Sequence, residues 1–166
     1  SNQSWDSAKF ETCGHKWADL SDNGVGLSLL NDCKYGYYAK DGRLELSLIK
    51  AGKYPNEDAD RGIHHFTYSV YPHRGRWQDA QTISQAYQLN VPLYGVAANG
   101  DGSLPETFST FRCSRENCFF EVAKQAEERD SVILRLYENH NMAVFNTVTC
   151  SLPVNTVYEC DLMERR

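Results

Sequence analysis

Residues 31–35 combine side chains that can bind and orient a polar ligand. An amide, a carboxylate, an amine and a phenol fall within these five positions, directly after an apolar run and before Gly36. Carboxylate and amide groups can make paired hydrogen bonds to sugar hydroxyls, and a tyrosine ring offers a stacking face. The other interpretation is a polar turn in which Asn31 or Asp32 caps its own backbone. The residue types alone leave both interpretations open.

A second stretch carries three histidines within ten residues, His64, His65 and His73. Such a density suggests metal binding or acid–base chemistry. However, neighbouring side chains of a strand point to opposite faces, so His64 and His65 cannot chelate one ion together. His73 lies far along the same extended segment. Single histidines that tie down a loop are therefore the favoured interpretation.

The six cysteines, at positions 13, 33, 113, 118, 150 and 160, are interpreted as thiols. A chain of this length does not need disulfides to fold. Cys113 and Cys118 form the one close pair, but their spacing has no CxxC partner and no HxxxH motif beside it. We therefore expect no metal or cofactor in this chain, and a zinc or redox site at this pair is the third-ranked hypothesis. Nucleophile-elbow, HExxH, P-loop and dinucleotide motifs are also absent from the sequence.

Short strand patterns dominate the elements that must position these residues. Alternating or apolar runs occur at 25–30, 44–48, 66–71, 118–122, 132–137, 144–150 and 156–163. Asp41-Gly42 predicts a hairpin turn, and Pro72 is expected to end its strand because it lacks a donor. One short helix is predicted from the apolar stripe of Trp77, Ala80, Ile83 and Tyr87.

Composition limits the class of protein. The 166 residues carry a net charge of −5, with 41% hydrophobic and 12% aromatic residues, which is typical of a soluble globular protein. No basic patch favours nucleic acid, and no apolar run reaches the roughly 20 residues that a membrane helix needs. No signal peptide is visible at the start, and we expect a cytoplasmic protein.

The predicted fold class is all-β, an antiparallel sandwich with one short helix. Residues 1–14 are interpreted as a tag remnant and lead-in because the chain begins with Ser-Asn. A turn-rich stretch at 94–105 separates residues 15–95 from a second sandwich segment at 96–166.

Several longer runs occur in one order along the chain and carry a family resemblance. They are HKWADLS (15–21), LNDCKYGY (30–37), LELSL (44–48), GIH (62–64), YPH (71–73) and VILRLYE (132–138). In these runs the chain resembles the C-terminal β-domains of retaining α-mannosidases of glycoside hydrolase family 38, especially the cytosolic and bacterial branch. The resemblance implies part of a mutarotase-like β-supersandwich followed by part of a small immunoglobulin-like sandwich.

The resemblance also implies a function for the longer parent polypeptide. Such a parent cleaves terminal α-linked mannose from oligosaccharides, and its catalytic carboxylates and divalent metal, usually zinc, belong to a domain outside this chain. This chain would then be inactive alone, with the rest of the parent as its partner. An apolar face should be exposed where the missing domain docks.

For individual residues, the resemblance implies two sets of roles. Asp32, Lys34 and Tyr35 would frame the substrate rim, and Asp60, Gly62 and His64 would fix a loop. The alternative hypothesis is a stand-alone carbohydrate-binding sandwich that uses Tyr35, Tyr37 and Trp77 as stacking platforms.

Overall fold

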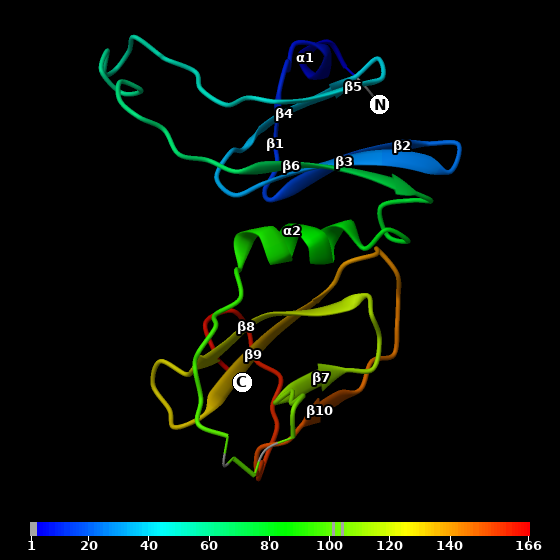
Figure 1. The fold of residues 1–166 in the computed structure, drawn as a ribbon, viewed down its shortest axis with the longest axis vertical. Helices are drawn as coiled ribbons and strands as arrows, with labels where there is room; N and C mark the ends of the chain where they lie inside the picture. The colour runs from blue at the N-terminus through cyan, green and yellow to red at the C-terminus, as the bar shows by residue number, and fades with distance from the viewer. Residues whose placement is uncertain (1–2, 101, 104) are drawn as a thin grey trace. The chain divides into compact units, whose positions relative to one another are not determined.

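The chain forms two compact units in a computed structural model that describes residues 3–100, 102–103 and 105–166. The first unit runs to Ala97 and the second begins at Ala98. Every strand pairing is antiparallel, and Figure 1 shows strands as the main elements of both units. The predicted all-β antiparallel class is confirmed. Among the described residues, one short helix is longer than a single turn, as predicted. No helix within the described ranges is long and apolar enough to cross a membrane.

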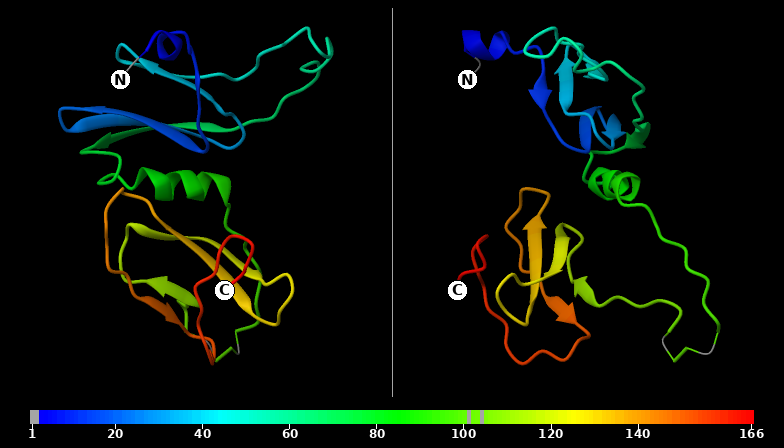
Figure 2. Two further views of the ribbon diagram at one scale, coloured as in Figure 1. Left: turned by 180° about the vertical axis from the view of Figure 1, so that it is seen from behind. Right: turned by 90° about the vertical axis from the view of Figure 1, so that its left-hand side faces the viewer.

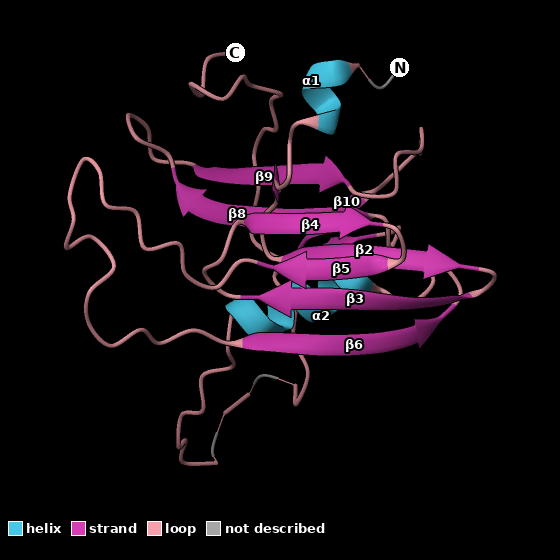
Figure 3. Ribbon diagram, turned by 90° about the horizontal axis from the view of Figure 1, so that it is seen from above, coloured by secondary structure: helices cyan, strands magenta, loops and turns pink. Residues whose placement is uncertain are grey.

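The first unit contains two three-stranded sheets and one packed helix. Its sheets have the strand orders β1-β4-β5 and β2-β3-β6. The elements are α1 (Ser4–Ser7), β1 (Thr12–Cys13), β2 (Trp17–Asp22), β3 (Val25–Asn31), β4 (Gly36–Lys40), β5 (Arg43–Leu46), β6 (Tyr68–Arg74) and α2 (Thr82–Asn90). Within this unit, the sheet β2-β3-β6 lies between the other sheet and α2 (Figures 1 and 3).

Two-residue turns set the register of both hairpins in this unit. Asp41 and Gly42 have φ values of 53° and 74° and close the β4–β5 hairpin, as the sequence predicts. Asn23 and Gly24, at 51° and 80°, close the β2–β3 hairpin in the same way. Left-handed conformations at both central residues define the type I′ turn, which suits Asn-Gly and Asp-Gly. The Asn23-Gly24 turn is an equally strong signal that the sequence reasoning missed.

Strand alternation divides the sheet β2-β3-β6 into an inner and an outer face. Ser28, Tyr71 and His73 lie on the inner face, where Tyr71 donates a hydrogen bond to the backbone oxygen of Ala80. Helix α2 covers this face and buries Thr82, Ile83 and Ala86. Because residues two apart in a strand share a face, the core of the unit forms between α2 and every second residue of β3 and β6.

The opposite face of the same sheet, toward the sheet β1-β4-β5, leaves a row of apolar side chains exposed, which we call the outer strip. It consists of Val25 and Leu27 on β3 and of Tyr68 and Val70 on β6, with exposed fractions of 60%, 38%, 54% and 56%. Their positions alternate with the inner residues of β3 and β6. The outer strip has the composition of a buried sheet face but is solvent-accessible here.

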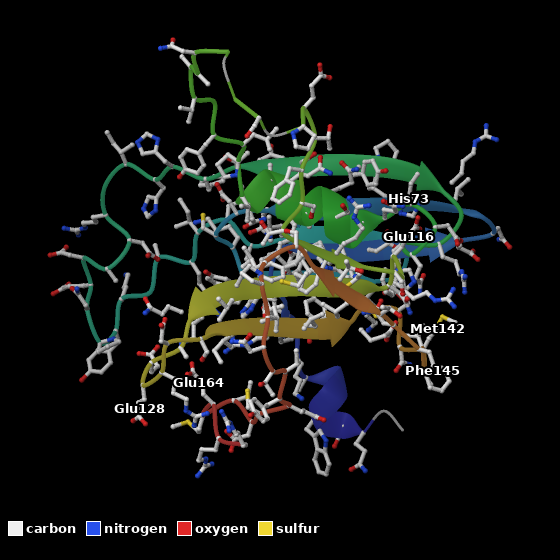
Figure 4. All side chains as sticks on the ribbon, turned by 90° about the horizontal axis from the view of Figure 1, so that it is seen from below. His73, Glu116, Glu128, Met142, Phe145 and Glu164 are labelled. Carbon is white, nitrogen blue, oxygen red and sulfur yellow. The ribbon has the colours of Figure 1, made fainter. Side chains whose placement is uncertain are left out.

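The second unit is built from two pairs of strands, shown from two sides in Figure 2. Its elements are β7 (Phe111–Cys113), β8 (Cys118–Gln125), β9 (Val132–Glu138) and β10 (Val148–Cys150). β8 pairs with β9, and β7 pairs with β10. Met142 and Phe145, labelled in Figure 4, lie on the exposed loop between β9 and β10.

Pro72 does not end its strand, contrary to the sequence prediction. β6 starts two residues later than expected and continues through Pro72 to Arg74. β6 is an edge strand, because it pairs on one side with β3 alone. Proline is tolerated in an edge strand, where alternate backbone N–H positions face away from the neighbouring strand.

The predicted helical stripe is only half correct. Ile83 and Tyr87 belong to α2, whereas Trp77 and Ala80 precede it in a series of turns. Gln81 has a φ of 52°, a left-handed conformation that separates these turns from the helix. The helix therefore starts at Thr82.

The last predicted strand, at 156–163, is also wrong. This segment forms no strand and ends in a turn, where Asp161 accepts backbone hydrogen bonds from Met163 and Arg165. A pattern of alternating residues becomes a strand only when a neighbouring strand is available to pair with it. The described residues place none beside this segment. The run at 144–150 likewise forms a strand only at Val148–Cys150.

Candidate functional site

The loop between β3 and β4, residues 32–35, carries the three candidate rim residues of the sequence analysis. Asp32 is exposed, and both of its carboxylate oxygens lie 3.0 Å from the backbone nitrogen of Thr67, which donates to them. This hydrogen bond, and then one from Cys33, lowers the pKa of Asp32. Asp32 is therefore a stable anion that ties its loop to the segment before β6.

The other two candidates each lie against a ring of the same unit. The Lys34 ammonium lies 4.8 Å from the centroid of the Phe66 ring, within the range of a cation–π contact. The Tyr35 ring meets the His15 ring edge to face, with centroids 5.0 Å apart. Tyr35 is 56% exposed. The loop thus presents an anion, a cation and an aromatic face, each oriented by a neighbour.

The structure confirms the interpretation that Asn31 caps a turn of its own backbone. Its side-chain oxygen accepts hydrogen bonds from the backbone nitrogens of Cys33 and Lys34, at 3.1 and 2.6 Å. Asn31 is only 1% exposed, so its own amide is not available to a ligand. The two interpretations of residues 31–35 are therefore compatible, because Asn31 forms the turn while the next residues are presented outward.

The second candidate set lies on the long loop before β6. The His64 Nε2 atom is 2.9 Å from the backbone oxygen of Asp60, and Gly62 between them has a φ of 135°. A side chain is rarely compatible with that conformation. This hydrogen bond closes a local turn from Asp60 to His64 with Gly62 between them, and the role of these three residues in fixing the loop remains a prediction.

The sequence reasoning missed a buried polar network on the inner face. Asp19 on β2 accepts hydrogen bonds from His73 Nε2 at 2.6 Å and from the Ser28 hydroxyl at 2.7 Å. The Ser28 hydroxyl also lies 2.8 Å from that of Thr82 on α2. The side chains of His73 and Asp19 are 3% and 5% exposed. His73, labelled in Figure 4, therefore joins β6 to β2 through Asp19, while Ser28 joins the sheet to α2 through Thr82.

The electrostatics of Asp19 follow from these contacts. Burial raises the pKa of its carboxyl group, but hydrogen bonds from Ser21, His73 and Ser28 outweigh that effect and lower it. A buried carboxylate needs such donors to remain ionised. The strand alternation of β2, β3 and β6 could have identified this network, since it places polar residues on the face that a helix covers.

Of the three proposed stacking platforms, one is buried and one is half-buried. Tyr37 is 2% exposed, and Asn31 donates a hydrogen bond to its hydroxyl. Trp77 is half-buried and packs on Trp17, with ring centroids 5.1 Å apart. Tyr35 alone of the three offers an open ring face. The stand-alone carbohydrate-binding hypothesis therefore loses most of its binding surface.

The cysteines are free thiols in both units. Burial, and then the nearby Cys113 and Glu138, raise the pKa of the Cys118 thiol. Within the described ranges, no group of three or more His, Cys, Asp or Glu side chains could hold a metal ion. The structure therefore offers no support for the zinc-site hypothesis at Cys113 and Cys118.

Comparisons with known proteins agree with this architecture. Residues 1–58 match the glycosyl hydrolases family 38 C-terminal domain. Residues 117–166 match the glycosyl hydrolases family 38 C-terminal beta sandwich domain. These two matches define the chain as a C-terminal β-sandwich region of glycosyl hydrolases.

Curated relatives specify the family further. The chain is 47% identical to human Alpha-mannosidase 2C1 over 168 residues, which is 99% of this chain. It is 41% identical to Alpha-mannosidase G of Dictyostelium discoideum and 32% identical to the Alpha-mannosidase of Saccharomyces cerevisiae. The chain belongs to glycosyl hydrolase family 38, as its C-terminal region. It spans 16% of the length of each of these relatives.

Proposed function

We propose that this chain is the non-catalytic C-terminal β-sandwich region of a retaining α-mannosidase, which hydrolyses terminal α-linked mannose of oligosaccharides. The observation that carries the proposal is the match of nearly the whole chain, at 32–47% identity, to proteins named as α-mannosidases. In this proposal the catalytic carboxylates and a divalent metal, zinc, belong to the remainder of the parent polypeptide, which works in the cytoplasm.

The proposed contribution of the first unit is to support the catalytic domain. The outer strip supports this, because Val25, Leu27, Tyr68 and Val70 expose a row of apolar surface on one sheet face. Burying this row against the rest of the parent would stabilise the contact by about 25 cal/mol for each Å² of apolar surface removed from water. Residues 15–95 would thereby form part of a β-supersandwich, and residues 96–166 part of the small C-terminal sandwich.

A second contribution is to frame the substrate rim with the loop between β3 and β4. Asp32, Lys34 and Tyr35 offer a hydrogen-bond acceptor, a donor and a stacking face on one short loop. These are the groups that recognise sugar hydroxyls and sugar rings. Asp60, Gly62 and His64 would stabilise the neighbouring loop, whose backbone meets Asp32 at Thr67.

The test compares this chain with the full-length parent polypeptide on a chromogenic α-mannoside in the presence of zinc. We expect hydrolysis by the parent and none by the chain alone. Hydrolysis by the repurified chain would reveal an active site within it and refute the non-catalytic role. A parent without activity on α-mannosides would refute the proposed reaction. Titration calorimetry adds a check, because saturable mannoside binding by the chain alone would favour the stand-alone module.

A further inference from the structure

The side chain of Asn31 accepts two hydrogen bonds from the backbone of the loop between β3 and β4. Asn31 is the last residue of β3, and the donors are the backbone N–H groups of Cys33 and Lys34. Both donors belong to the loop itself. The buried amide therefore sets the backbone path from which Asp32, Lys34 and Tyr35 project.

The remaining polar groups of Asn31 connect this loop to three other elements. Its side-chain nitrogen donates to the hydroxyl of Tyr37, which follows the loop on β4. Its backbone nitrogen donates to the oxygen of Lys16 at 2.9 Å. Its backbone oxygen accepts a hydrogen bond of 3.0 Å from the side-chain nitrogen of Asn90, near the end of α2. Asn31 thus bonds to the loop, to the strand after it, to the segment before β2 and to the helix.

We propose that Asn31 is a positioning residue for the substrate rim, and that α2 acts on the same loop through Asn90. This inference rests on the proposed function, because it assigns the loop to the rim of a mannosidase. The side chains of the rim residues lie against half-buried or exposed partners, namely Thr67, Phe66 and His15. Asn31, at 1% exposure, is the buried anchor against which their orientation is defined.

The chemistry explains why such an anchor affects substrate binding. Sugar hydroxyls are recognised by hydrogen bonds whose energy falls steeply when donor and acceptor move out of line. Without the Asn31 amide, the N–H groups of Cys33 and Lys34 lose their acceptor, and the loop backbone turns outward to reach water. The rim side chains then move, while the strands on either side keep their own ladders.

A matched pair of variants in the full-length parent separates positioning from stability. Asn31→Ala removes the anchor, whereas Ser28→Ala removes an equally buried hydrogen-bonding group on the same strand that has no contact with the loop. We expect Asn31→Ala to raise KM for a mannose-containing oligosaccharide about tenfold, equivalent to about 1.4 kcal/mol. In this proposal a small chromogenic mannoside does not reach the rim, so its KM with Asn31→Ala should stay within about twofold, as should kcat of that variant. Both KM values of Ser28→Ala should also stay within about twofold of those of the unsubstituted parent.

Two further variants test the hydrogen-bonding logic. Asn31→Asp keeps an acceptor oxygen for the Cys33 and Lys34 amides, and it should recover most of the lost affinity for the oligosaccharide. Asn90→Ala removes the donor from α2 and should raise the same KM about threefold. Equal KM values in Asn31→Ala and Ser28→Ala would overturn the inference, as would an Asn31→Asp variant no better than Asn31→Ala.

Amide hydrogen exchange provides a readout that does not depend on activity. Exchange at Cys33 and Lys34 should accelerate at least tenfold in Asn31→Ala and remain unchanged in Ser28→Ala. Unchanged exchange in Asn31→Ala would refute the anchoring role itself. If the parent hydrolyses no α-mannoside, the proposed function fails, and exchange at these amides still decides whether Asn31 anchors the loop.

Discussion

Replacing Asp19 with alanine should destabilise the first unit more than any surface substitution on β2. Asp19 accepts hydrogen bonds from His73 and Ser28 on the face that α2 covers. Its removal leaves the His73 Nε2 donor buried without an acceptor, at about 1–3 kcal/mol, whereas the Ser28 hydroxyl keeps that of Thr82 as a partner. Loss of the hydrogen bonds that Asp19 accepts from Ser21 and Ser28 adds about 0.5–1.5 kcal/mol each, so we expect a total loss of about 3 kcal/mol.

Urea unfolding of the chain measures this loss, with two variants as controls. Asp19→Asn keeps one acceptor oxygen and should lose about half as much free energy of unfolding. Asp22→Ala lies on the same strand at an exposed position and should change stability by less than about 0.5 kcal/mol. A loss of less than about 1 kcal/mol for Asp19→Ala, or one equal to that of Asp22→Ala, would refute the idea that this network holds α2 on the sheet.

Three further outcomes are expected. The pKa of Asp19 is lowered from its ordinary value of 3.8, so the stability that its carboxylate contributes is present above that value and is lost as pH falls through the lower pKa of the folded state. In urea unfolding between about pH 2 and 6, the free energy of unfolding should therefore decline less steeply with falling pH for Asp19→Asn than for the unsubstituted chain. Parallel curves would contradict this. Val70→Asp on the outer strip should change the free energy of unfolding by less than about 0.5 kcal/mol and should reduce the binding of a hydrophobic dye. A loss of about 2–5 kcal/mol, as for a core residue, would mean that this face is covered. Gly42→Ala, at a φ of 74°, should cost about 1–2 kcal/mol and Gly52→Ala should not, as thermal unfolding would show; equal effects would argue against the left-handed turn.

Local signals in the sequence determined the parts of this fold that short-range physics controls. Asp41-Gly42 predicts its hairpin because few other residues adopt two consecutive left-handed conformations at low cost. The alternation at 66–71 predicts a strand, although it places both ends incorrectly. The ordered runs that include residues 15–21 and 30–37 also indicate family 38 by their resemblance, and the comparisons with known proteins confirm that family.

Tertiary structure decided the features that depend on a partner. Pro72 remains within β6 because that strand has one neighbour, and residues 156–163 form no strand because none is placed beside them. Trp77 follows the helical periodicity but packs on Trp17 outside the helix. Sequence periodicity describes which face a side chain occupies, whereas the neighbour that covers that face comes from a distant part of the chain.

The same distinction holds for the candidate site. The sequence by itself determined that residues 31–35 combine amide, acid, amine and phenol, and so identified the loop. Only the folded chain decided that Asn31 points inward to anchor the loop while Tyr35 stays exposed. The physical reason is that Asn31 is hydrogen-bonded to Tyr37 on the next strand and to Asn90 on α2, 59 residues on. No local pattern encodes contacts over such separations, and they arise only when sheet and helix pack together.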